Sequence, residues 1–164
     1  MSRVLNELEI VQNPSLGAFA LWRFGVGFQS ESGVASPLPL GFLVLPLLLH
    51  QPTRKIIAST QRNSGLALFA AKLGEERENL LAVHERALAL RRLSLQSIAM
   101  GANNRLLSVD YGAATLRANT ADDVLKKPPL PERIRGFSNA AEKVGFWFSR
   151  LSLHQVASTL LVSF

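Results

Sequence analysis

The stretch SPLPLGFLVLPLLLHQPTR, residues 36–54, decides the fold because it is the most apolar part of the chain. Its leucines leave almost no polar face, so other segments of the chain or a partner protein must cover it. A bilayer-spanning helix needs roughly 20 uninterrupted apolar residues. This run is shorter and contains Pro39 and Pro46, which interrupt a helix. We therefore predict a core element, and we expect no membrane contact.

The composition predicts one mainly helical domain that folds around leucine, alanine and valine. Of the 164 residues, 48% are hydrophobic but only 7% are aromatic, a balance typical of packed helices. The chain has no cysteine, which excludes disulfides, thiolate metal sites and cysteine nucleophiles and suits a cytoplasmic protein. The first residues, MSRVLNELEIVQNP, lack the apolar core of a signal peptide. We expect a cytoplasmic location.

The chain is strongly basic, with a formal net charge of +6 and a pI near 10.5. Arginine outnumbers lysine by more than two to one. Because a guanidinium forms bidentate pairs with phosphate or carboxylate, this bias indicates a polyanion or an acidic protein as partner. The alternative is that these charges are simply solvated, since net charge concerns association and not fold.

Helical patterns dominate the rest of the chain, so the expected fold class is mainly α (α+β). Asn13 and Pro14 suit the N-cap and the first position of a helix whose apolar face continues to Phe28. Residues 64–108 have helical spacing of apolar side chains. A last amphipathic helix is predicted at 138–151, and Ser152 is placed to cap a short terminal helix.

The clearest β signal is RLLSVDYGAATLRA, residues 105–118, which predicts a hairpin with its turn at Tyr111-Gly112. Together with helices expected near 77–91 and 94–103, this hairpin gives the order of a winged-helix unit. The second of those helices contains no Lys or Arg that could read base edges. We therefore favour a winged-helix-like module for protein contact over a sequence-specific DNA reader. The polar side chains left for base contact are Gln96, Asn103 and Asn104.

The domain organisation is set by a proline-rich, basic segment at 121–137, which has the composition of a linker. Its three prolines favour an extended path. We expect a helical, winged-helix-like domain over residues 1–120. A C-terminal helical segment, 138–164, is expected to pack back on that domain or on a partner, because the chain ends with apolar residues.

No pattern in the sequence predicts catalysis, and we expect no cofactor, metal ion or small-molecule substrate. There is no glycine-rich phosphate loop followed by Lys and Ser or Thr. His50, His84 and His154 are far apart and lack metal-ligand spacing. The pair Asp122-Asp123 is typical of a solvated turn. We expect His50 to cap the carbonyl end of the apolar helix that precedes it.

Four local strings together resemble one protein family. They are Asn13-Pro14, the block PLGFLVLPLLLH at 39–50 followed by Thr53-Arg54, the hairpin at 105–118, and GFWFSRL at 145–151. Over residues 13–162 the chain is similar to the middle component of bacterial three-component ABC systems (ABC-3C). One departure lies in the terminal LLVSF, which has leucine where a glycine is expected before the last valine.

The resemblance implies a non-catalytic adaptor in a Lamassu-like anti-phage defence complex. Its implied partners are an SMC-like or Rad50-like ABC ATPase and a nuclease-type effector subunit. Obligate interfaces resemble a core cut in half, so part of the apolar surplus is expected to contact these partners. The partner-interface candidates are Phe42, Leu45, Leu48, His50, Arg54, Trp147, Phe148 and Phe164.

Contact with nucleic acid is the second expectation. Basic side chains around the hairpin and in the linker are candidates for non-specific contact with the DNA backbone, or with acidic patches on the ATPase. The alternative function is a winged-helix DNA-binding regulator, for which Gln96, Asn103, Arg105 and Arg117 would be the contacts. The nucleic-acid candidates are Arg105, Arg117, Lys126, Lys127, Arg133 and Arg135.

Overall fold

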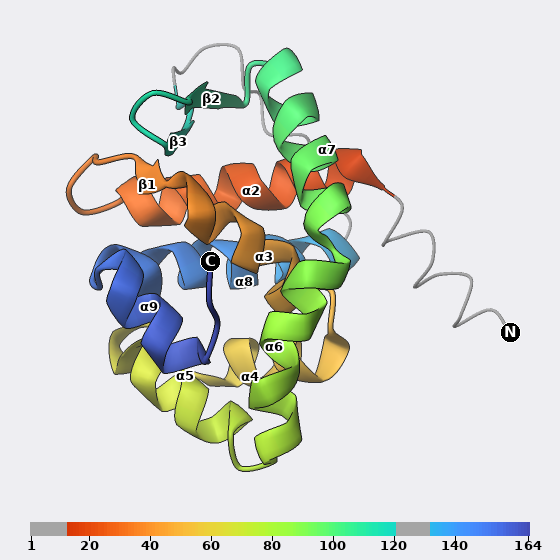
Figure 1. Cartoon of the computed structure of the whole chain (residues 1–164), viewed down its shortest axis with the longest axis vertical. Helices are drawn as coiled ribbons and strands as arrows, with labels where there is room; N and C mark the ends of the chain where they lie inside the picture. The colour runs from red at the N-terminus through yellow and green to blue at the C-terminus, as the bar shows by residue number, and fades with distance from the viewer. Residues whose placement is uncertain (1–12, 121–131) are drawn as a thin grey trace, which may run out of the picture.

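The computed structural model describes residues 13–120 and 132–164. Helices predominate beside a small antiparallel sheet, which confirms the predicted mainly α (α+β) class. Figure 1 shows helix α2 crossing the molecule between the sheet and most of the other helices. The elements in chain order are α2 (Pro14–Gln29), β1 (Ser36–Pro37), the 3-10 helix η1 (Leu38–Leu40), α3 (Gly41–Leu48), α4 (Gln51–Ser59), the 3-10 helix η2 (Arg62–Ser64), α5 (Gly65–Leu73), α6 (Arg77–Ala89), α7 (Arg91–Asn103), β2 (Leu107–Asp110), β3 (Thr115–Ala118), α8 (Glu132–Ser149) and α9 (Leu153–Leu160).

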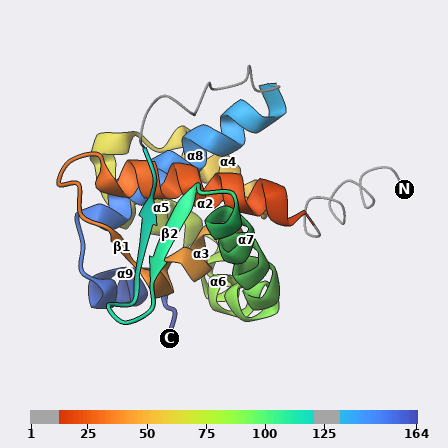
Figure 2. The ribbon, with the colours of Figure 1, turned by 90° about the horizontal axis from the view of Figure 1, so that it is seen from above.

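Helix α2 is the central element and packs against α8, α7 and β3. It begins as predicted, because Oδ1 of Asn13 accepts hydrogen bonds from the backbone N–H groups of Ser15 at 3.1 Å and Leu16 at 3.2 Å. Pro14 occupies its first turn, where no N–H is needed. Figures 1 and 2 both show α8 running alongside α2.

Two glycines let α2 and α8 approach until their backbones touch. A Cβ on Gly27 would lie 2.0 Å from the carbonyl oxygen of Glu142, and one on Gly145 would lie 2.0 Å from the carbonyl oxygen of Phe24. No side chain fits at such distances, so both positions require glycine. Arg23 of α2 pairs with the carboxylate of Glu142 across the same contact. The close approach of α2 and α8 therefore depends on these two glycines.

The apolar run folds as η1 and α3, and the chain itself covers most of it. Leu43, Leu45, Leu47 and Leu48 are each at most 1% exposed. Helix α3 packs against α2, α6, α7 and α8, so it is surrounded by elements from both halves of the sequence. Pro46 lies inside the helix. The prediction of a core element is confirmed.

The predicted hairpin is present, since β2 and β3 pair antiparallel with Asp110 opposite Thr115. The sequence analysis did not predict the short strand β1, which pairs with the other edge of β3 and gives the order β1-β3-β2. The side chain of Gln29, at the end of α2, also binds the backbone of β3. Its side-chain nitrogen donates to the carbonyl oxygen of Ala118 at 3.1 Å, and its side-chain oxygen accepts from the Ala118 N–H at 2.7 Å.

Helices α6 and α7 follow in the predicted order but are joined differently from the helices of a helix-turn-helix unit. Only Leu90 separates them, and it serves as the C-cap of α6 and the N-cap of α7. They run end to end in Figure 1 and are seen along their axes in Figure 2. A helix-turn-helix crosses its helices at a steep angle through a turn of three or four residues. Here α6 packs on α3 and α7 on α2.

The C-terminal helices belong to the same packed body. Helix α8 begins at Glu132, so residues 132–137 are helical and not part of the predicted linker. The rest of the predicted linker, 121–131, lies outside the described residues. Indole Nε1 of Trp147 donates to the carbonyl oxygen of Arg62 at 2.9 Å. Ser152 caps α9 as predicted, in a capping box with Gln155.

Candidate partner-binding groove

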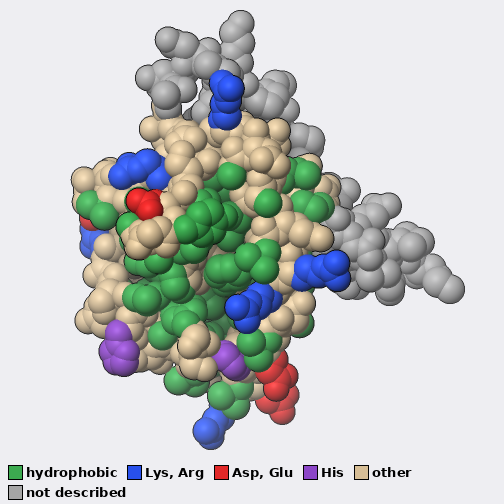
Figure 3. All heavy atoms as spheres, turned by 45° about the horizontal axis from the view of Figure 1, so that its top comes forward, with side chains coloured by type: hydrophobic (Ala, Val, Ile, Leu, Met, Phe, Trp, Pro, Cys, Tyr) green, Lys and Arg blue, Asp and Glu red, His purple; other side chains and the backbone are tan. Residues whose placement is uncertain are grey.

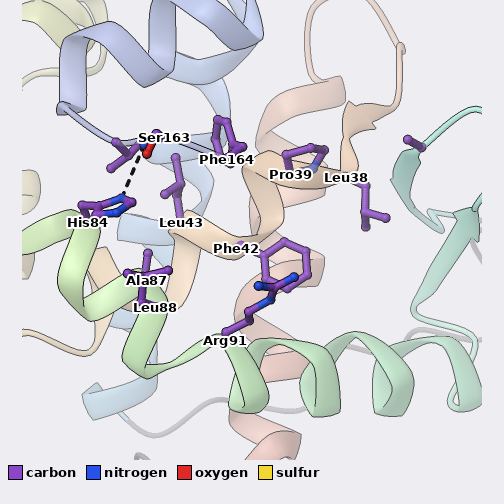
Figure 4. Close-up of a pocket in the computed structure, with 12 residues that line it drawn as sticks. Leu38, Pro39, Phe42, Leu43, His84, Ala87, Leu88, Arg91, Ser163 and Phe164 are labelled. Atoms are coloured by element: carbon purple, nitrogen blue, oxygen red, sulfur yellow. Dashed lines mark hydrogen bonds between the residues drawn. The ribbon is translucent and has the colours of Figure 1, made fainter.

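An apolar groove with a volume of about 300 Å³ opens on one face of the molecule. One wall comes from η1 and α3, with Pro39 and Phe42, and the opposite wall comes from α6, with Leu88. The C-terminal tail contributes Val162 and Phe164. Figure 4 shows these three segments surrounding the groove. Residues that are far apart in the sequence thus meet at one apolar surface.

The C-terminal tail is held in place by backbone geometry. Leu161 ends α9 in the left-handed conformation, with φ 57° and ψ 43°, which turns the chain back toward α6. The Val162 N–H then donates to the carbonyl oxygen of Ala157 at 3.0 Å. The Ser163 N–H approaches Nδ1 of His84 at 3.4 Å (Figure 4). Phe164 stays 60% exposed, so the tail brings an aromatic ring to the groove without burying it.

The charged side chains at the groove are basic. Among the described residues that line it, none is Asp or Glu, whereas Arg91 and His84 both contribute. Figure 4 shows Arg91 extending toward the ring of Phe42. In Figure 3, hydrophobic side chains gather in the middle of the drawn face, and Lys or Arg side chains, with a few Asp or Glu side chains, lie around them. Such a surface suits an apolar segment that also carries a carboxylate.

Two arginines satisfy carbonyl groups at the C-terminal end of α3, the helix that forms one wall of the groove. Nη1 of Arg54 donates to the carbonyl oxygen of Leu48 at 2.6 Å, and Nε of Arg86 donates to that of Pro46 at 3.2 Å. Cations are favoured at this end of a helix. Burial lowers the pKa of both guanidinium groups from the usual arginine value. These arginines position α3 and are not free for a partner.

His50 stands at the N-cap position of the next helix, α4. Its Nδ1 lies 2.7 Å from Oγ1 of Thr53. His50 also directly follows Leu49, the C-cap of α3, where the two arginines just described donate to the helix carbonyl groups. His50 therefore belongs to the junction between α3 and α4.

The predicted interface residues separate into three groups. Phe42 and Phe164 meet at the groove. His50 and Arg54 are half-buried at the α3–α4 junction. The other four are at most 1% exposed and form part of the chain's own core, so the expectation that they lie at a surface is corrected. These four are Leu45, Leu48, Trp147 and Phe148.

The predicted nucleic-acid residues are only partly described. Arg105 and Arg117 are exposed beside and within the hairpin, and Nη1 of Arg117 donates to the carbonyl oxygen of Gly33 at 3.0 Å. Arg135 is exposed on α8. Lys126 and Lys127 lie outside the described residues, and so does the side chain of Arg133.

Sequence reasoning missed the α6 side of the groove. The sequence analysis found helical spacing of apolar residues over 64–108 but assigned no role to Leu88, of which 58% is exposed. A signal was present in the sequence: Leu88 lies seven residues from both Leu81 and Leu95. Val83 and Leu93 already supply buried contacts for these helices, so the heptad leucines form a second apolar face.

Within residues 13–120 and 132–164, no group of three His, Cys, Asp or Glu side chains could hold a metal ion. In the same part of the chain, no helix is both long and apolar enough to cross a membrane.

The fold and the groove define a class: a small, mainly helical protein with an uncovered apolar surface suited to contact with another protein. The comparison with family models then gives the family. The chain belongs to the family described as ABC-three component (ABC-3C) system Middle Component 3, whose model matches residues 1–164. This confirms the resemblance to a middle component, an accessory part of a complex with partners. Neither the search of curated proteins nor the search of solved structures gave a match.

Proposed function

We propose that this chain is a non-catalytic adaptor that joins an SMC-like or Rad50-like ABC ATPase to a nuclease-type effector in a Lamassu-like anti-phage defence complex in the cytoplasm. The observation that carries the proposal is the apolar groove, where Leu88 and Phe164 are more than half exposed beside the partly buried Phe42. Membership of a middle-component family supports it, since such a component acts within an assembly.

Burial of the groove would supply much of the binding energy. Leu88 is 58% exposed and Phe164 is 60% exposed. Burying a fully exposed side chain of this kind contributes about 1.5–3 kcal/mol, so covering the exposed part of each contributes somewhat more than half of that. Interfaces concentrate their energy in a few well-buried anchors. The groove offers two such anchors beside the cation of Arg91, so a modest contact could hold a partner subunit.

The test is reconstitution of the complex from its full-length chains. An ABC ATPase and an effector of the same three-component system would be co-expressed with this chain, with an affinity tag on one subunit at a time. We expect the ATPase and the effector to be linked only when this chain is present. A direct, stoichiometric ATPase–effector complex without it would contradict the bridging role. Turnover of nucleotide or cleavage of DNA by the isolated chain would contradict the non-catalytic role.

DNA contact is the second candidate function, and the hairpin is the observation that favours it. Arg105 and Arg117 are exposed there, and Tyr111 at the turn is 80% exposed. A winged-helix regulator would keep a preference for base sequence as salt rises, whereas an adaptor would show weak binding with a salt slope and no preference. Duplex affinity of the isolated chain, measured against salt with Arg105→Ala and Arg117→Ala variants, separates the two.

A further inference from the structure

The outer face of α6 and α7 carries leucines at heptad spacing. Leu81, Leu88 and Leu95 follow at intervals of seven residues and are 47%, 58% and 52% exposed. His84 and Arg91 lie between them, so the five positions alternate in steps of three and four. This is the spacing of the seam along which one helix packs against another. We call these five residues the heptad stripe.

The stripe is additional to the face that α6 and α7 use within the chain. Val83, Leu93 and Ile98 are at most 7% exposed and supply the inward contacts. The two helices run end to end, and the 14-residue step from the first leucine to the last spans about 20 Å at 1.5 Å per residue. That length matches about four turns of a partner helix.

The stripe and the groove form one continuous surface. His84, Leu88 and Arg91 belong to both. A helix laid along the stripe would therefore place a side chain in the groove beside Leu88, between Phe42 and Phe164. Helix-in-groove recognition uses this arrangement, in which an amphipathic helix inserts its apolar residues.

The charge of the stripe determines the chemistry of its occupant. Arg91 and Arg92 are exposed on α7, whose sequence contains no Asp or Glu, whereas Glu78 and Glu85 are exposed on α6. The basic end of the stripe is therefore its α7 end. A carboxylate on the occupant would pair with this arginine cluster. A second copy of this chain is disfavoured, because two bodies with a formal charge of +6 each repel one another.

We infer that the heptad stripe binds an amphipathic helix of another subunit of the complex. That helix carries apolar residues in steps of three and four, inserts one of them into the groove, and places Asp or Glu against Arg91 and Arg92. This inference rests on the proposed function and adds which surface is used and what kind of segment it receives.

Site-specific photocrosslinking tests the inference in the assembled complex. The complex of full-length chains would be prepared with p-benzoylphenylalanine in place of Leu88, and the crosslinked segment identified by mass spectrometry. The matched control carries the same group in place of Leu68, a leucine on α5 that is 42% exposed and off the stripe. We expect position 88 to crosslink to a helix of the ATPase or effector with the stated pattern, and position 68 not to reach that helix.

The other outcomes are decisive. A crosslink from position 88 to a second copy of this chain, or to a segment without apolar 3–4 spacing and carboxylates, would overturn the inference. So would an intact complex with no crosslink at 88, and in that case the adaptor role would survive. Failure of the three chains to associate at all would remove the proposed function together with the inference.

Substitutions give a second, quantitative test. Leu88→Glu should weaken association with the partner at least tenfold, about 1.4 kcal/mol, while Leu68→Glu leaves it unchanged. Arg91→Glu should also weaken association, and by less at high salt, because screening reduces the charge contribution. Both positions are exposed, and urea unfolding of each variant checks that the fold is intact. Equal affinity of the Leu88→Glu and Leu68→Glu chains would overturn the inference.

Discussion

Leucine side chains are present both on α3 and on the outer face of α6 and α7, but the chain buries only the leucines of α3. Leu45 and Leu48 of α3 have no exposed surface, whereas Leu88 and Leu95 are more than half exposed. The presence of leucine alone does not distinguish the two regions. Their patterns do, because α3 is apolar around its whole circumference and must be enclosed, while the leucines of α6 and α7 form a single seam on otherwise polar helices.

The two regions also differ in how closely their elements approach. On the covered side, α2 and α8 meet at Gly27 and Gly145 with their backbones in contact. On the uncovered side, α6, α3 and the C-terminal tail leave a groove of about 300 Å³. Stability is thus concentrated around α2, α3 and α8, and the surface left for a partner lies where packing is incomplete.

The largest expected effect comes from truncating one leucine in each region. Leu45→Ala should lower the free energy of unfolding by about 3–5 kcal/mol, because it leaves a cavity in a close-packed core. Leu88→Ala should change it by no more than about 0.5 kcal/mol, as at other exposed positions. Urea denaturation of the two variants measures both values. Similar losses at the two positions would mean that the heptad stripe is part of the core.

The glycine contact should give the next largest effect. Gly145→Ala would place a Cβ 2.0 Å from the Phe24 carbonyl oxygen, and α8 would have to move away from α2 at a cost of about 2–3 kcal/mol. Gly136→Ala is the matched control on the same helix, because a Cβ there has no neighbour within 4 Å. It should raise stability by about 0.5–1 kcal/mol. A tolerated alanine at 145 would show that the backbones are not in obligatory contact.

The sequence predicted the structure correctly where a local signal decides it. The Asn13-Pro14 start, the enclosed apolar helix, the hairpin and the Ser152 cap all follow from propensity, capping and periodicity. It was insufficient where distant segments meet. Nothing local marks Ser36-Pro37 as an edge strand, and nothing assigns Arg86 to the carbonyl end of a helix 40 residues earlier. The groove needs three such segments, so only its Phe42 and Phe164 were among the predicted residues.

The C-terminal tail offers a smaller, stabilising change on the uncovered side. Leu161 has φ 57°, a conformation that costs a residue with a Cβ about 1 kcal/mol. Leu161→Gly should therefore raise the free energy of unfolding by up to about 1 kcal/mol, offset partly by the greater entropy of the unfolded glycine chain. Ser163→Gly, at a position outside the left-handed region, should give no gain. Thermal or urea unfolding compares the two, and a loss of stability in Leu161→Gly would contradict the strain argument.

The smallest effect concerns a lysine on the covered side. Nζ of Lys143 donates to the carbonyl oxygens of Ile57 at 3.0 Å and Thr60 at 2.9 Å, at the end of α4. Burial, and secondarily the charge of Lys72, lower the pKa of Lys143 in the folded chain. Between this lowered pKa and the ordinary lysine value the unfolded chain binds more protons, so stability from this group rises with pH in that window. At lower pH both states are protonated and its contribution no longer changes.

The variant Lys143→Met isolates this contribution from the other groups that titrate in the same range. The free energy of unfolding, measured in urea from about pH 8 to pH 10, should rise more steeply with pH in the unmodified chain than in the variant. Lys55→Met, on the exposed surface of α4, is the matched control for replacing a lysine by methionine. A slope unchanged by Lys143→Met would mean that the ammonium group is as well solvated in the folded chain as in the unfolded one. The contact between α8 and the end of α4 would then be open to water. At that position the covered side would not differ from the uncovered side.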